Sequence, residues 1–520
     1  MLNYWWVTRP KRKLNSIPEV LAAFSAAALD KEWQGQRGSH LSFEAALEKE
    51  GLKRIGERRD QTGGGARTYK AWLMSLGLIF THESTKTTKL TLAGEAIMDG
   101  KSPVEVLTNQ VLKYQFPSPF SLSRNIDVNS RFKIHPFVFL LRLLADNRIV
   151  YLTQDEIAKI VVTEAENETD KCFEYIVSRI LQFRSHGDAI LDADFDTKYS
   201  SSKGNGSQAG RFAHLSDLAN TLINWIEYTQ LARRNDDSQL EILSGKMHEV
   251  EQILANPPKF IDRPANQEYF QRKYGIDPYH QKDTRDLTHS SVITAQIIAE
   301  TKIKNAFIAE SLRKPISKIT PALVDSIAET TGIESKLVEE TLLKFYPRGA
   351  VGAFMTEYFE MAFKGRDQCT EFEIATTEIF RDIFHINSIH LGQTGSKSAP
   401  DVLLISDEDN YQAIIDTKAY HKYSITGDHR NRMVHNYIER ASVYSDCKYP
   451  IGFFAYIAGG FSDQIDKQIR GISAESGVHG AGINVSNMIK LIEKQESSPF
   501  SHASLRGLFS ADRQILLSDI

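Results

Sequence analysis

Two carboxylates and one amine stand at the ends of neighbouring apolar runs in the C-terminal third of the chain. Asp401 follows a proline and precedes the run VLLI, and Asp416 and Lys418 lie in the run YQAIIDTKAY. A buried strand gains nothing from such groups, because charges are costly to remove from water. The pattern therefore indicates a chemical site rather than part of a core.

The spacing suggests which chemistry these groups would perform. Side chains alternate along a strand, so Asp416 and Lys418 should project to one face and Thr417 to the other. Asp401 and Asp416, with the carbonyl of Thr417, are hard oxygen ligands that suit Mg²⁺, which keeps several waters. Lys418 would reach an attacking water or the charge that develops on a phosphate, and the metal would lower the pKa of a bound water. We therefore expect phosphodiester hydrolysis.

A further carboxylate is expected from the preceding segment TEFEIATTEIFRDIF, which has the periodicity of an amphipathic helix. Glu373 is the favoured candidate and Glu378 the less favoured one. The two lie five positions apart, which is about 140° around a helix, so both should not face one site.

The surrounding segments indicate how the site is held. A Gly/Ser/Lys loop leads to Asp401, DEDN forms a turn, and YPIGFFAYIAGGF is a third apolar run. The order helix, strand, hairpin turn, strand, helix, strand predicts a mixed sheet flanked by helices over residues 345–520. By itself, a Pro-Asp and Asp-x-Lys pair is equally typical of a surface turn with a salt bridge at the strand end; the context favours the chemical site.

Length and composition indicate the class of protein and the number of domains. The chain has 520 residues, enough for about three or four domains. Of these residues, 41% are hydrophobic and 25% are charged, as is typical of globular proteins. It contains no apolar run long enough to span a membrane. The three cysteines lie far apart and fit no zinc pattern, so we expect reduced thiols in a bacterial cytoplasm. The net charge of −4 leaves room for local basic surfaces.

The first such surface is expected in residues 1–144. A helix ending at Gly51, a Gly-rich turn, a second helix, two short strands and a further helix form the order of a winged helix. Its second helix would enter the major groove of DNA. The alternatives are a solvated charged face and a winged helix that packs against protein. In both halves of the recognition region together, the candidate DNA-binding residues are Arg9, Lys11, Arg12, Arg58, Arg59, Arg67, Tyr69, Lys70, Lys203 and Arg211.

A similar order recurs in residues 145–257. A short helix, a Gly/Ser loop, a long amphipathic helix and a candidate wing with the turn NDDS suggest a second winged-helix-like domain. Two such modules suit an asymmetric DNA site read by a monomer. The segment ANPPKF then breaks the pattern, and the sequence predicts a helical connector over residues 258–344, with a third small subdomain as the alternative. The fold class is thus multidomain, α+β and α/β.

The C-terminal motifs resemble those of a known nuclease domain. PDVLLI, IIDTKAY, TEFEIATTEIF, FFAYIAGGF and GAGINVSNMI are similar to segments of the FokI-type PD-(D/E)xK cleavage domain, over about residues 345–510. The resemblance implies that Asp401, Asp416 and Lys418 are catalytic, that Glu373 occupies the acidic position of the helix, and that Mg²⁺ is the cofactor. The segment GDHRNRMVHNYIER does not align cleanly with the family's dimer-forming residues, which leaves the dimer interface open.

The N-terminal half resembles another group. NYWWVTRPKRKLNSI, RTYKAWLMSLGLIF, KLTLAGEAIM and VLKYQFPSP are similar to the recognition region of AlwI/BstNBI-type endonucleases, over about residues 1–250. This implies a type IIS restriction endonuclease that binds a short asymmetric site in double-stranded DNA and cuts at a fixed distance downstream. A transient homodimer through the nuclease domain and a cognate DNA methyltransferase, as a genetic partner without direct contact, are implied with it.

Three alternatives stay open at this point. One catalytic site cuts one strand, so the enzyme could be a strand-specific nicking endonuclease. A winged-helix regulator with an inactive nuclease domain is a second alternative, although the complete Asp, Asp, Lys set argues against it. A modification-dependent nuclease would need an aromatic cage, for which Trp5 and Trp6 are a weak indication, because such pairs usually pack in cores.

Overall fold

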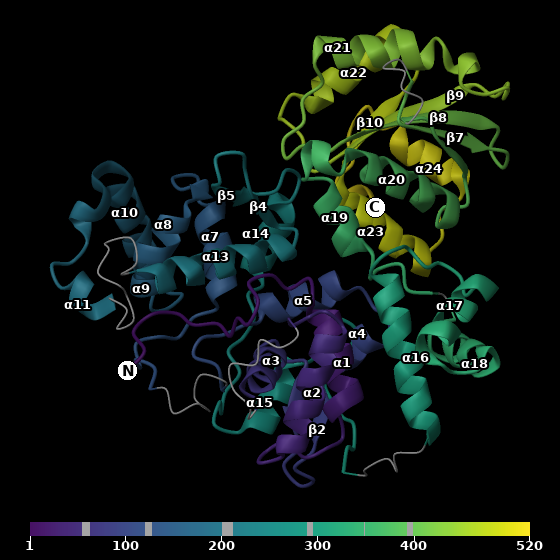
Figure 1. Ribbon diagram of the computed structural model, residues 1–520. Coiled ribbons are helices and arrows are strands. Elements are labelled where there is room, and N and C mark those ends of the chain that lie inside the picture. The colour runs from purple at the N-terminus through teal and green to yellow at the C-terminus, as the bar shows by residue number, and fades with distance from the viewer. Residues whose placement is uncertain (55–62, 120–126, 200–211, 289–294, 348, 393–398) are drawn as a thin grey trace. The chain divides into compact units, whose positions relative to one another are not determined.

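The computed structural model describes residues 1–54, 63–119, 127–199, 212–288, 295–347, 349–392 and 399–520. The chain divides into two compact units (Figure 1). The N-terminal unit comprises Met1–Ala309 and Pro321–Phe345, and the C-terminal unit comprises Glu310–Thr320 and Tyr346–Ile520. The finer division into four domains stays a prediction.

The C-terminal unit is built on a six-stranded mixed sheet with the order β11-β10-β9-β8-β7-β6. The pairs β6–β7 and β7–β8 are antiparallel, whereas the pairs β8–β9, β9–β10 and β10–β11 are parallel. This confirms the mixed sheet expected from the sequence. The strands are β6 (Asn387–His390), β7 (Val402–Ser406), β8 (Tyr411–Lys418), β9 (Ile451–Ala458), β10 (Gly480–Asn484) and β11 (Arg513–Gln514).

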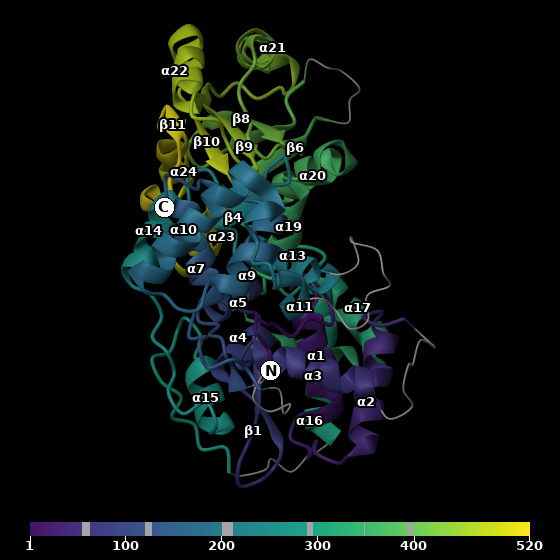
Figure 2. The ribbon, with the colours of Figure 1, turned by 90° about the vertical axis from the view of Figure 1, so that its left-hand side faces the viewer.

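Helices cover both faces of this sheet, as Figures 1 and 2 show. One face carries α19 (Met355–Met361), α20 (Cys369–Asp382), α23 (Val485–Ser497) and α24 (His502–Phe509). The other carries α21 (Gly427–Asn431), the π-helical turn η5 (Arg432–Ile438) and α22 (Ile465–Ser476). Because both faces are covered, the central strands are apolar throughout instead of alternating.

The core under α21, η5 and α22 shows which side chains of the strands share a face. Leu403, Ile414 and Tyr456 belong to this core, together with Met433 and Ile469 from the covering helices. Since every second residue of a strand points the same way, Asp416 continues the row of Ile414. The site residues of β8 therefore extend a buried row at the strand's end.

The first part of the N-terminal unit is mainly helical and has one short hairpin. Strands β1 and β2 are antiparallel, with Ile79 opposite Leu90, and α15 packs against β1. Phe24, Trp33 and Phe43 form an aromatic core between the first helices. The elements are α1 (Ile17–Ala28), α2 (Arg37–Lys49), α3 (Gly64–Ser75), β1 (Ile79–Thr81), β2 (Thr88–Leu90), α4 (Leu92–Met98), α5 (Pro103–Leu112) and α15 (Gln267–Tyr274).

The second part holds a three-stranded antiparallel sheet of order β3-β5-β4 beside the long helix α13. Trp225 of α13 stacks on Phe137 at a ring-centroid distance of 5.6 Å. The elements are α7 (Pro136–Ala145), β3 (Tyr151–Leu152), α8 (Gln154–Glu156), η1 (Ile157–Val161), α9 (Val162–Glu164), α10 (Asp170–His186), η2 (Gly187–Ile190), α11 (Phe195–Tyr199), α13 (Ala213–Tyr228), β4 (Ala232–Arg234), β5 (Leu240–Ile242) and α14 (Met247–Ala255).

The N-terminal aromatic pair lies in this second part. Trp5 is fully buried and its indole donates a hydrogen bond of 2.8 Å to the carbonyl of Ala165. Arg9 lies over the ring of Trp6, 4.8 Å from its centroid. A buried indole with a satisfied N–H is a packing residue, so the structure gives no support to an aromatic cage at Trp5.

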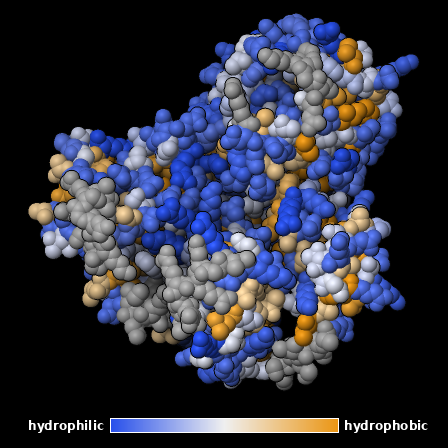
Figure 3. Space-filling view, viewed as in Figure 1, coloured by the Kyte–Doolittle hydropathy of each residue, from blue (hydrophilic) through white to orange (hydrophobic). Residues whose placement is uncertain are grey.

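After α15 the chain continues with the helices α16 (Ala295–Ser311), α17 (Pro321–Thr331) and α18 (Ser335–Phe345). None of the helices among the described residues has the length and apolar character needed to cross a membrane. On the face shown in Figure 3, hydrophilic residues predominate and hydrophobic ones form small scattered groups.

Candidate active site

The register of β7 and β8 brings the two aspartates together. In this antiparallel pair Val402 is opposite Ile415, so continuing the ladder by one residue puts Asp401 opposite Asp416. On its other side, Asp416 pairs with Tyr456 of β9. The hairpin turn thus sets the separation of the two carboxylates through the spacing of neighbouring strands.

Thr417 fixes the orientation of the Asp401 carboxylate. Oδ2 of Asp401 accepts hydrogen bonds from the Thr417 amide at 2.7 Å and from the Thr417 hydroxyl at 3.0 Å. Thr417 is buried, with 7% of its surface exposed. The sequence suggested only a role for its carbonyl, whereas the structure shows that its amide and hydroxyl also hold Asp401.

Lys418 pairs with Asp416, as the alternation along the strand predicts. Its Nζ lies 2.7 Å from Oδ1 of Asp416 and donates a hydrogen bond of 3.1 Å to the carbonyl of Thr417. Burial lowers the pKa of the Lys418 ammonium, but Asp416 and Asp401 outweigh this effect, and the net pKa is above its usual range. The amine is therefore positively charged at neutral pH.

Asp401 lies in an environment that disfavours its charge. Burial raises the pKa of its carboxyl well above the usual range, and the negative charges of Asp416 and Glu373 raise it further, while Lys418 opposes them. Three carboxylates face one ammonium here. With all three carboxylates ionised the cluster would carry excess negative charge, which a divalent cation would offset.

Glu373 belongs to this cluster and Glu378 does not. The Glu373 charge raises the pKa values of both Asp401 and Lys418. Burial raises the pKa of Glu378, and its charged neighbours are Arg381, Asp382 and Lys314. The two glutamates of α20 thus face different surroundings, as expected from their separation around the helix.

The sequence analysis overlooked His390. This residue ends β6, and its Nε2 lies 2.9 Å from Oε2 of Glu373. The signal was a histidine at the end of β6, on the same edge of the sheet as Asp401 before β7 and Lys418 at the end of β8. It went unused because nothing in the sequence states that β6 is the neighbour of β7.

Among the described residues, no group of three or more His, Cys, Asp or Glu side chains is arranged to hold a metal ion. Mg²⁺ needs less than this, because one or two carboxylates suffice and waters complete its octahedral shell. Asp401 and Asp416 are oxygen donors, and when both are ionised their negative charge exceeds the positive charge of Lys418. The residues present therefore fit a hard divalent cation.

The candidate DNA contacts on α3 differ in exposure. Arg67 is exposed, whereas Tyr69 and Lys70 are 8% and 6% exposed. The Tyr69 hydroxyl donates to the carbonyl of Leu52 at 3.2 Å, and the Lys70 ammonium lies 5.1 Å from the ring centroid of Trp33. Tyr69 and Lys70 thus lie on the buried face of α3, which differs from the expectation that they reach DNA bases together with Arg67.

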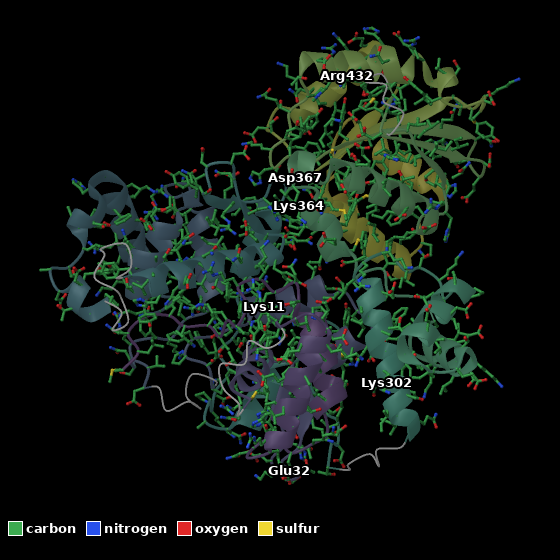
Figure 4. The ribbon with its side chains drawn as sticks, viewed as in Figure 1. Lys11, Glu32, Lys302, Lys364, Asp367 and Arg432 are labelled. Atoms are coloured by element: carbon green, nitrogen blue, oxygen red, sulfur yellow. The ribbon has the colours of Figure 1, made fainter. Side chains whose placement is uncertain are left out.

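The N-terminal basic cluster lies against the start of α13. Arg9 is half-buried and donates to the carbonyl of His214 at 3.4 Å, and burial lowers its pKa. Arg12 is exposed and pairs with Asp217 at 2.5 Å. Figure 4 labels Lys11 in the N-terminal unit. The candidates Arg58, Arg59, Lys203 and Arg211 lie outside the described residues.

Comparisons with solved structures give low similarity over long stretches. The structure of restriction endonuclease FokI has 14% identity and a TM-score of 0.29, with 99% of this chain and 100% of that chain covered. FokI bound to DNA has 14% identity and a TM-score of 0.28, with 99% of each chain covered. The BpuJ1 endonuclease binding domain in complex with modified DNA has 14% identity and a TM-score of 0.35, with 53% and 96% covered. No curated protein matches the chain.

Family models match nearly the whole length after the first helices. The model described as the FokI cleavage domain matches residues 332–516, which include the mixed sheet and the carboxylate cluster. The model described as AlwI restriction endonuclease matches residues 74–334, half of the chain. The protein therefore belongs to the AlwI family of type IIS restriction endonucleases, which are site-specific DNA hydrolases, and it carries a FokI-type cleavage domain.

Proposed function

We propose that this enzyme binds a short asymmetric site in double-stranded DNA and hydrolyses phosphodiester bonds at a fixed distance downstream, with Mg²⁺. The observation that carries the catalytic half of the proposal is the cluster at the ends of β7 and β8. There, Asp401, Asp416 and Lys418 converge on the edge of a buried sheet. Buried groups with strongly shifted pKa values and specific charged partners are typical of catalytic sites.

Each residue has a distinct role in this proposal. Asp401, Asp416 and the carbonyl of Thr417 would hold the metal, with Glu373 as a further carboxylate for its shell. The bound cation would supply charge neutralisation at the phosphate and a more acidic water. Lys418, kept charged by Asp416, would orient the attacking water and stabilise the negative charge that grows on the phosphate oxygens.

Recognition is proposed for the N-terminal unit. The order of α3, the β1–β2 hairpin and α4 supports a winged helix in residues 1–144, and α13 with β4 and β5 supports a second in residues 145–257. Residues 258–344 would connect them to the nuclease domain in residues 345–520. The proposed DNA contacts are best supported where the side chain is exposed, as for Arg67 and Arg12.

Double-strand cutting requires two catalytic sites, and the chain has one such cluster among its described residues. We propose that two nuclease domains meet transiently on DNA for double-strand cleavage. Strand-specific nicking is the second candidate, favoured by that single cluster. In the restriction–modification setting, a DNA methyltransferase would protect the same site without contacting this enzyme.

The first test replaces Asp416 with Asn, which keeps the shape of the side chain and removes its charge. Cleavage of supercoiled plasmid in Mg²⁺ should fall roughly 100-fold or more, because the cation and Lys418 lose their shared partner. Binding of the protein to its DNA site, measured by gel shift in EDTA, should persist. Asp463→Asn, at an exposed carboxylate of the same unit, is the matched control and should cut normally.

The products distinguish the alternatives. Discrete fragments whose ends lie at a constant distance from one short motif, formed with Mg²⁺ and not with EDTA, support the proposal. Open circles without linear product indicate a nicking enzyme. An Asp416→Asn variant that cuts like the wild-type protein overturns the assignment of the site.

A further inference from the structure

The end of β6 is joined to the residue that carries the Asp401 carboxylate. His390 is opposite Val402 in the β6–β7 ladder, and the amide of Leu391 donates a hydrogen bond of 2.9 Å to the carbonyl of Asp401. A side chain at the end of β6 therefore keeps a fixed position relative to the site. His390 is that side chain.

His390 holds one oxygen of the Glu373 carboxylate. The Nε2–Oε2 distance is 2.9 Å, and each side chain retains 16% exposure. A hydrogen bond to a carboxylate requires the proton on Nε2, which fixes the tautomer of a neutral ring. Such a bond from a rigid strand restricts the rotation of a glutamate that otherwise has several rotamers.

Gly392 closes the other side of this pair. A Cβ at this position would lie 2.1 Å from Oε2 of Glu373 and 3.0 Å from Nε2 of His390, well inside van der Waals contact. The backbone of residue 392 therefore lies directly against the bonded pair. A residue with a Cβ would take the space that Oε2 of Glu373 occupies, so the backbone of residue 392 limits the pair on one side.

The carboxylate held in this way faces the catalytic cluster. Glu373 is bonded to His390, which lies opposite Val402, the residue that follows Asp401, and the amide of the next residue, Leu391, bonds to the carbonyl of Asp401. Carboxylates that bind metals are commonly oriented by a hydrogen bond from outside the shell, and loss of such a partner costs about 10–100-fold in metal affinity or activity.

We propose that His390 is a positioning residue: it holds the Glu373 carboxylate beside the metal ligands Asp401 and Asp416, where it would bind the waters that complete the metal shell. The inference rests on the proposed function, since it assumes that the cluster binds a divalent cation. Gly392 is part of the same device, because it provides the space in which Glu373 is held.

Metal binding without DNA provides a readout that is independent of cleavage. His390→Leu should weaken Mn²⁺ binding, measured by titration calorimetry of the full-length protein, by about 10–100-fold. His390→Gln retains an N–H donor and should keep binding within a few-fold of the wild-type value. His479→Leu, which replaces an exposed histidine paired with Asp512 in the same unit, is the matched control and should bind Mn²⁺ normally.

A double-mutant cycle separates positioning from a general structural role. If His390 acts through Glu373, the variant carrying His390→Leu and Glu373→Gln should bind Mn²⁺ no more weakly than Glu373→Gln alone. Additive losses, or wild-type Mn²⁺ affinity in His390→Leu, would overturn the inference.

Should His390→Leu fail to fold, Gly392→Ala tests the same positioning of Glu373, because its methyl group displaces Glu373 while His390 remains. Wild-type Mn²⁺ affinity in Gly392→Ala would then overturn it.

The same titration distinguishes failure of this inference from failure of the proposed function. Asp416→Asn should abolish Mn²⁺ binding if the cluster is the metal site. Loss of binding in Asp416→Asn with normal binding in His390→Leu refutes only the role of His390. Normal binding and normal cleavage in Asp416→Asn refute the proposed site itself.

Discussion

At the scale of one residue, Asp401, for which we propose a catalytic role, opposes the stability of the fold. Its pKa is raised well above the usual range by burial and by the charges of Asp416 and Glu373. The folded state therefore binds this proton more tightly than the unfolded state, and stability falls as pH rises from the ordinary Asp value of about 3.9 through the raised pKa.

This gives a prediction for the metal-free protein. Asp401→Asn should increase the free energy of unfolding in EDTA at pH 8, because the buried charge is removed while the hydrogen bonds from Thr417 have an acceptor. The increase should shrink as pH is lowered below the raised pKa. Urea unfolding at several pH values measures it; a variant that is less stable at pH 8 than the wild type contradicts the prediction.

Arg67 and Lys70 provide a matched pair, three positions apart on α3. Burial lowers the pKa of Lys70 to about 8, so its charge opposes folding by roughly 3 kcal/mol below that pH, before its contact with Trp33 is counted. Lys70→Met should therefore stabilise the protein at pH 7 by about 2–3 kcal/mol, less as pH rises from 8 towards 10.5.

DNA binding should depend on the exposed Arg67 and not on the buried Lys70. Arg67→Ala, at an exposed position, should weaken binding to the cognate site by about 1–3 kcal/mol, whereas Lys70→Met should leave it unchanged. Fluorescence anisotropy at fixed salt concentration measures both. Equal losses in the two variants would show that Lys70 leaves its buried position on DNA.

At the scale of elements, two helical glycines differ in what surrounds them. A Cβ on Gly94 in α4 would lie 2.1 Å from the carbonyl oxygen of Leu78, whereas nothing lies within 4 Å of a Cβ on Gly38 in α2. Gly94→Ala should destabilise the protein by about 1–3 kcal/mol through this contact. Gly38→Ala should stabilise it by up to about 1 kcal/mol. Urea unfolding measures both, and a neutral Gly94→Ala would contradict this packing.

The sequence predicted the elements that depend on local patterns. Alternation placed Asp416 and Lys418 on one face, and apolar runs marked the strands of the mixed sheet. The exposure of side chains in the N-terminal unit could not be predicted from local patterns. Tyr69 and Lys70 are polar residues, and their burial depends on α2 and the segment around Leu52. His390 required knowledge of strand order, which no local pattern contains.

At the scale of the whole molecule, the C-terminal unit includes a segment that precedes its main part. The amide of Ala350 donates to the carbonyl of Ile316 at 2.8 Å, and the two residues form an antiparallel bridge. A Cβ on Gly349 would lie 2.0 Å from the same carbonyl oxygen, so this contact is close. The segment Glu310–Thr320 therefore belongs to the folded unit.

A comparison of two fragments tests this division. The fragment 310–520 should melt at a higher temperature than the fragment 346–520, because only the first retains the bridge at Ile316. Residues 321–345 belong to the N-terminal unit and have no packing partners in the longer fragment. Circular dichroism follows the transition, and the wild-type chain provides the reference. Equal melting temperatures would show that residues 310–320 do not stabilise the unit.

The division in the chain also bears on how such enzymes exchange parts between genes. The polypeptide passes from one unit to the other at three places, after residues 309, 320 and 345. A single recombination event therefore cannot replace one unit and leave the other complete: a crossover before codon 310 transfers α17 and α18 with the cleavage unit, and one after codon 345 leaves residues 310–320 behind. Hybrid enzymes with a new DNA specificity should accordingly arise more readily between parents whose residues 310–345 are nearly identical, because either crossover then leaves the contacts of both segments unchanged.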